Sequence, residues 1–157
     1  MSKYIRMHQV EADPMTRGEY NEKRGWKIPA NENPADEGYI VTYPDGYVSW
    51  CPKAQFEAAA RPCDGMTFGM AIEAMQRGKK VCRKGWNGKG MYVWLMPGST
   101  VIGCPNIVDP HLAEIDKTEG KIDFLGSIRM RTADGCVLTG WLASQTDILS
   151  EDWMIVE

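Results

Sequence analysis

The chain has 157 residues, of which 43% are hydrophobic and 25% charged, and its formal net charge is −3. This composition is typical of a globular protein with a buried core, and it disfavours an intrinsically disordered chain. The acidic balance argues against a general binder of long nucleic acid, which usually carries a strong basic excess. The length fits one medium domain or two small ones.

Residues 1–62 predict a small β-α-β-β-α unit. Its predicted elements are a strand at 3–12, a helix at 16–25 with a Thr16–Glu19 capping box, a hairpin at 38–50 around Pro-Asp-Gly, and a helix at 52–60. A unit of this size buries little surface by itself. We therefore expect it to pack on the main domain or on another subunit.

Residues 63–157 predict a second domain, and the join lies near residues 58–67, where a helix-like run ends in Arg-Pro and then Asp-Gly. Thr67 is the expected N-cap of a helix that Gly78 stops. The remaining predicted elements are a hairpin at 80–96, a hairpin at 127–143, a short helix after the N-cap Ser144, and a closing strand at 152–157. Residues 101–124 lack clean periodicity, so we expect a long insertion there. The order predicts an α+β fold, with an antiparallel β-sheet and a few short helices.

The loop between the strands at 80–96 has more glycine, cationic and aromatic residues than a tight turn requires. Glycine-rich loops expose N–H groups, which with positive φ can form concave anion sites. Arg83 and Lys89 would add contacts to phosphate, Trp86 could stack on a purine, and Asn87 could pair with its edge or with a ribose hydroxyl. The alternative interpretation is a hairpin loop whose Trp86 folds back onto the sheet.

The other aromatic and basic positions divide between core and surface. Trp94 and Trp153 are expected in the core, whereas Trp141 is ambiguous between core and site. Arg129 and Arg131 alternate along one strand, where they form either a solvated face or a basic stripe for a ligand or an interface.

No residue pattern indicates catalysis. The chain has two histidines, His8 and His111, without a partner at metal-ligand spacing, so we expect no metal, no cofactor and no catalytic triad. The carboxylates of Glu151 and Asp152 are chain neighbours, which rarely face one another. None of the five cysteines forms a C-x-x-C pair, which favours reduced thiols. No membrane span and no secretory signal are predicted, so we expect a cytoplasmic protein.

Residues 65–156 carry four motifs in order. They are Thr-Phe-Gly-x-Ala from Thr67, Arg-x-Gly-Trp-Asn-Gly-Lys from Arg83, Gly-Trp-x-x-Ser-Gln-x-Asp from Gly140, and Asp152-Trp153. This set resembles the second described type of phage Thoeris anti-defense proteins, and the first part resembles a short phage module that can precede this domain. By this resemblance, residues 63–157 would be a cyclic-nucleotide-binding domain.

The resemblance implies a non-enzymatic sponge in the cytoplasm of the infected bacterial host. Such a protein binds the cyclic ADP-ribose isomer made by Thoeris TIR proteins and holds it without cleaving it, so that the effector is never activated. The resemblance also implies a homo-oligomer, a tetramer, with ligands at subunit interfaces, and cyclic dinucleotides of CBASS defence as further ligands. Rival hypotheses are an enzyme that degrades such a signal, a module that binds a host protein, and a binder of single-stranded nucleic acid. The acidic balance disfavours the last.

The candidate ligand-binding residues combine the loop with the positions carried over by motif. They are Phe68, Arg83, Trp86, Asn87, Lys89, Trp141, Gln145 and Asp147. Phe68 could equally belong to the core, and Asp147 could equally serve the helix dipole. We expect Trp86→Ala and Asn87→Ala to leave the fold intact and to weaken ligand binding.

Overall fold

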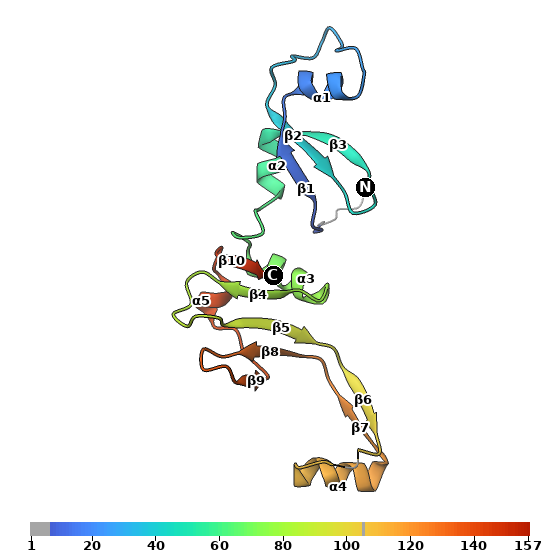
Figure 1. The fold of residues 1–157 in the computed structure, drawn as a ribbon, viewed down its shortest axis with the longest axis vertical. Coiled ribbons are helices and arrows are strands. Elements are labelled where there is room, and N and C mark those ends of the chain that lie inside the picture. Colours follow the sequence, from blue (N-terminus) through green and yellow to red (C-terminus); the bar gives the residue numbers. More distant parts are fainter. Residues whose placement is uncertain (1–6, 105) are drawn as a thin grey trace. The chain divides into compact units, whose positions relative to one another are not determined.

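The computed structural model describes residues 7–104 and 106–157. The chain forms two compact units, Met1–Pro62 and Cys63–Glu157 (Figure 1). Both combine short helices with antiparallel strands, so the predicted α+β class is confirmed. The expected packing of the first unit on the second stays a prediction.

The first unit has the predicted β-α-β-β-α order. It consists of β1 (Glu11–Pro14), α1 (Arg17–Lys23), β2 (Gly38–Thr42), β3 (Val48–Pro52) and α2 (Lys53–Ala59), with strand order β1-β2-β3. The capping box of Thr16 and Glu19 is present, and Gly25 follows the helix with φ of 69°.

The predicted strand at 3–12 is wrong in its bounds. Residues 3–6 lie outside the described residues, residues 7–10 are not in a strand, and β1 runs from Glu11 to Pro14. The physical reason is that β2 sets the length of this edge strand, by pairing Thr42 with Glu11 and Tyr39 with Pro14. An alternating pattern in one segment does not reveal where its partner ends.

The second unit is built on a five-stranded antiparallel sheet. Its elements are α3 (Phe68–Gln76), β4 (Lys80–Arg83), β5 (Tyr92–Met96), β8 (Ser127–Arg131), β9 (Val137–Thr139), α5 (Gln145–Ile148) and β10 (Trp153–Val156). The strand order is β10-β4-β5-β8-β9, so the last strand of the chain pairs with β4. This pairing brings the C-terminal segment beside the start of the loop that follows β4.

One face of this sheet forms the core together with α3. Ala71 of α3 packs with Val81, Val93 and Trp153, and all four are completely buried. Thr67 caps α3, since its hydroxyl accepts from the N–H of Met70, as the sequence predicts. Apolar residues on α3 thus cover one side of the sheet, and the alternate strand positions point to the other side.

Residues 101–124, expected from the sequence as a long insertion without clean periodicity, form an arm with regular secondary structure. The arm consists of β6 (Ser99–Ile102), α4 (Pro110–Glu119) and β7 (Lys121–Phe124), and Figure 1 shows α4 at its far end. β6 and β7 pair as a separate two-stranded sheet. Periodicity fails here because each strand has only four residues and much of the arm's apolar surface is exposed.

The arm joins the main sheet at a glycine pair. A side chain at Gly98 would lie 2.9 Å from the carbonyl oxygen of Phe124, and one at Gly126 would lie 3.4 Å from the backbone nitrogen of Gly98. The two backbones approach too closely for a Cβ atom at Gly98 without a shift of the neighbouring chain.

Candidate functional site

The guanidinium of Arg83, at the end of β4, is held by two carboxylates from the C-terminal segment. Its Nε donates to Oδ1 of Asp152 and its Nη1 donates to Oδ1 of Asp147, both at 2.8 Å. Only 11% of the Arg83 side chain and 13% of the Asp147 side chain are exposed. This ion pair is therefore shielded from water and is much less screened than a surface pair. We call the three residues the Arg83 latch.

Asp147 is the centre of the latch because donors from three directions converge on its side chain. Oδ1 accepts from Arg83 and, at 3.0 Å, from the indole N–H of Trp86. Oδ2 accepts from the hydroxyl and the backbone N–H of Ser144, at 2.6 and 3.0 Å, in the capping box of α5. The local cap and the long-range ion pair thus share one carboxylate.

The electrostatics of the latch keep both carboxylates ionised. Burial by itself would raise the pKa of Asp147, but hydrogen bonds from Ser144, Arg83 and Trp86 outweigh it and lower the pKa from 3.8 to about 2. The hydrogen bond from Arg83 lowers the pKa of Asp152 as well. In return, the pKa of Arg83 is raised, chiefly by its hydrogen bond to Asp152.

Trp86 folds back from the loop onto the core. Its ring centroid lies 5.5 Å from that of Trp153 and 5.9 Å from that of Trp141, and both contacts are edge-to-face. Trp153 is completely buried, and its indole N–H donates to the backbone carbonyl of Asp147. The structure therefore agrees with the folded-back alternative for the loop tryptophan, and the three indoles pack as one aromatic cluster.

The three loop glycines serve three different purposes. A side chain at Gly85 would lie 2.8 Å from Oδ2 of Asp152, the atom that accepts from the Gly85 N–H. A side chain at Gly88 would collide with Met91 and lie 2.8 Å from the Cβ of Ala133. Gly90 alone of the three has positive φ, at 72°. Since the Gly85 N–H donates to Asp152, it is not free to donate to an anion.

The eight sequence-predicted candidates fall into two groups. The structure joins Arg83, Trp86, Trp141 and Asp147 through the latch and the aromatic cluster, and Phe68 reaches the same cluster through Trp153 at 5.3 Å. Asn87, Lys89 and Gln145 are exposed. Contact of any of the eight with a ligand stays a prediction, and the accessible polar groups among them are those of the second group.

Two residues of the site were not among the sequence-predicted candidates. Asp152 holds both the guanidinium of Arg83 and the N–H of Gly85, and the N-cap Ser144 fixes the orientation of Asp147. The capping spacing of Ser144 and Asp147 is a local signal that did identify the cap. No local pattern relates Asp152 to Arg83, because 69 residues separate them.

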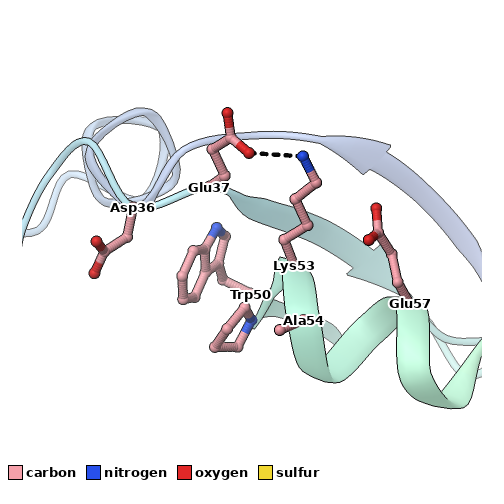
Figure 2. Close-up of a pocket in the computed structure, with 7 residues that line it drawn as sticks. Asp36, Glu37, Trp50, Lys53, Ala54 and Glu57 are labelled. Atoms are coloured by element: carbon pink, nitrogen blue, oxygen red, sulfur yellow. Dashed lines mark hydrogen bonds and ion pairs between the residues drawn. The ribbon is translucent and has the colours of Figure 1, made fainter.

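The first unit contains a hollow of about 470 Å³ beside β3 and α2 (Figure 2). It is lined by Trp50, Pro52 and Ala54 and by four charged residues, Asp36, Glu37, Lys53 and Glu57. Lys53 is paired with Glu37 at 2.7 Å. Three carboxylates against one ammonium group disfavour a phosphate-bearing ligand in this hollow.

Within residues 7–104 and 106–157, no group of histidine, cysteine and acidic side chains has the arrangement of a metal site. Among the helices of the same residues, none has both the length and the apolar character of a membrane span.

The fold and the site define a small α+β domain in which a buried ion network ties the loop after β4 to the C-terminal segment. The family model of the Thoeris anti-defense 2-like domain matches residues 66–156, which is most of the second unit. The chain is also 34% identical over 96 residues to Thoeris anti-defense 2 of Bacillus phage SP01, and the match covers 58% of this chain and 94% of that protein. The chain therefore belongs to the Thoeris anti-defense 2-like family, and the predicted resemblance is confirmed.

Proposed function

We propose that this chain is a sponge, which binds a cyclic nucleotide immune signal and sequesters it without cleaving it. The proposed ligand is the cyclic ADP-ribose isomer made by Thoeris TIR proteins, and cyclic dinucleotides of CBASS are the second ligand class. The protein would act in the cytoplasm of the infected bacterial host, where these signals are made. Membership in an anti-defense family supports this role.

The observation that carries a binding role, as opposed to a catalytic one, is the state of the carboxylates beside the loop. A general acid or base works best when its pKa lies near the operating pH. Asp147 has a pKa of about 2, and both its oxygens already accept hydrogen bonds. The latch is therefore suited to hold the loop in one conformation, which lowers the entropic cost of ligand binding.

Within this proposal the loop contacts the ligand through its accessible groups. Lys89 would contact phosphate, and Asn87 would pair with a base edge or a ribose hydroxyl. Gln145 would contribute from α5, which the latch ties to the loop through Asp147. Four other candidates would support the loop from the core side, namely Phe68, Arg83, Trp86 and Trp141. Any contact of these four with the ligand would involve the exposed parts of their side chains.

We further propose that the protein is a homo-oligomer, a tetramer, with its ligands held between subunits. The exposed apolar side chains of the second unit support an assembly of this kind. Leu142 is 89% exposed, Leu149 77%, and Val137 on the edge strand β9 55%. Exposed leucines and valines favour association, as does an edge strand with an unpaired side. Light scattering at micromolar concentration tests this, and a clean monomer would contradict the interface model.

The experiment that tests the sponge is capture and release. The protein is mixed with the TIR-derived cyclic ADP-ribose isomer and filtered, and the retained protein is then heated and its released small molecules are analysed. A sponge removes the signal from solution and returns it unchanged on heating. Release of fragments would instead favour a degrading enzyme. A signal that never leaves solution would contradict binding, and cyclic dinucleotides would then be tested in the same way.

A further inference from the structure

The five-stranded sheet has a second face, which α3 and the core do not occupy. Val81, Val93 and Met130 point into the core. Their chain neighbours in β4, β5 and β8 therefore point to the opposite side. In the register of β5 and β8, Trp94 lies opposite Arg129 and Tyr92 lies opposite Arg131, and residues directly opposite one another share a face. Lys80 of β4 belongs to the same face, which we call the open face.

The aromatic side chains of the open face are neighbours. The rings of Tyr92 and Trp94 have centroids 5.6 Å apart and are tilted by 49°, and the ammonium of Lys80 lies 5.2 Å from the centre of the Tyr92 ring. Both aromatic residues are only partly buried, and the expectation from the sequence that Trp94 belongs to the core is wrong, because Trp94 lies on the face opposite to that of Val93. They offer apolar surface of the kind on which a nucleobase stacks.

The charge of the open face is positive and unbalanced. The side chains of Arg129 and Arg131 form no hydrogen bond or ion pair with the described part of the chain, and the Nε of Arg129 is buried without a partner. No residue of the five strands that shares this face is acidic. A buried, unsatisfied donor on a charged group is costly. Arg129 is partly exposed and Arg131 is exposed, so their side chains are placed to donate to an anionic partner from outside the described chain.

We propose that the open face binds a phosphorylated nucleotide, with the base on Trp94 and Tyr92 and the phosphate on Arg129 and Arg131. This proposal gives a role to Arg129 and Arg131, which make no contact in the ligand-binding scheme proposed for the loop after β4. It rests on the proposed function for the identity of the ligand as an immune signal, but the chemistry of the face requires only an aromatic base and a phosphate. The contrast with Arg83 supports it, since both sides of that guanidinium are already engaged by carboxylates.

The test compares binding of two probes, the TIR-derived cyclic ADP-ribose isomer and ADP, by titration calorimetry. The variants are Trp94→Ala and Arg129→Gln. Matched controls are Trp26→Ala, an exposed tryptophan of the first unit, and Lys117→Gln, an exposed cation of α4. We expect each open-face variant to weaken binding roughly ten-fold or more, since stacking and charge-assisted contacts have that size, and the controls to bind normally. Thermal melts of each variant, together with the charge-conserving variant Arg129→Lys, separate a loss of ligand binding from a loss of folding.

The outcomes separate this proposal from the sponge. Tight binding of the isomer with unchanged affinity in both open-face variants would overturn the open-face assignment and leave the sponge intact. Binding of ADP alone, weakened in both variants, would support the open face and contradict the proposed ligand. If neither probe binds at millimolar concentration, both proposals fail. If the variants lose assembly by light scattering at unchanged affinity, the face is a subunit interface and the nucleotide assignment is wrong.

Discussion

Replacing Asp147 with asparagine removes the negative charge on which the latch converges. Asparagine keeps the size of the side chain but cannot accept at both terminal atoms, so donors from Ser144, Arg83 and Trp86 compete for one oxygen. Arg83 keeps only Asp152 as a charged partner. We expect the second unit to lose stability at neutral pH and to remain folded.

The size of the effect follows from the pKa of Asp147, which is lowered from 3.8 to about 2. At ~1.4 kcal/mol per unit, the folded state prefers the ionised carboxylate by about 2–3 kcal/mol. Because the folded-state pKa is the lower one, this stabilisation is complete above pH 3.8 and disappears as the pH falls to about 2. Asp147→Asn should therefore lose about 2–3 kcal/mol at pH 7 and progressively less, relative to the unmodified chain, at acidic pH.

Urea unfolding measures this difference, followed by the NMR signal of the Trp153 indole because that side chain is completely buried in the second unit. Asp64→Asn is the matched control, since Asp64 pairs with Lys84 at 3.1 Å and both side chains are more than half exposed. The control should change stability by less than about 0.5 kcal/mol. A stability difference between Asp147→Asn and the unmodified chain that stays constant from pH 7 to pH 2 would refute the reasoning.

Four further substitutions probe the local structure. Thr67→Ala removes the cap of α3 and should cost about 1 kcal/mol in the same urea assay, whereas no loss would contradict the cap. Gly88→Ala forces a methyl group toward Ala133 and should cost about 1–3 kcal/mol, and an unchanged melting temperature would show that the loop is looser than described. Trp86→Ala should cost about 3 kcal/mol through lost packing, while Asn87→Ala should leave the melt unchanged, and equal melts would contradict the folded-back indole.

The last pair revises the expectation drawn from the sequence, in which both variants leave the fold intact. Trp86 contacts the core and donates to Asp147, so reduced binding by Trp86→Ala would combine a ligand effect with a structural one. Asn87 is exposed and is the cleaner probe of ligand contact.

Several elements could be predicted from the sequence because their signals are local. The N-caps Thr16, Thr67 and Ser144 each bond a residue three positions along the chain, and the structure confirms all three. The Asp-Gly turns at Gly46 and Gly135 also lie where positive φ is required. Such features depend on a few neighbouring residues, so the sequence by itself determines them. The motifs that identify the family are local in the same sense.

Other features were decided only by the tertiary structure. The pairing of Arg83 with Asp147 and Asp152 depends on β10 joining the sheet beside β4, and this position in the sheet is not a property of either segment alone. The same holds for the open face, where the sequence shows that Arg129 and Arg131 alternate but not that Trp94 lies opposite Arg129. Register and strand order arise from burying one face of the whole sheet at once, so they belong to the fold and not to any stretch of the chain.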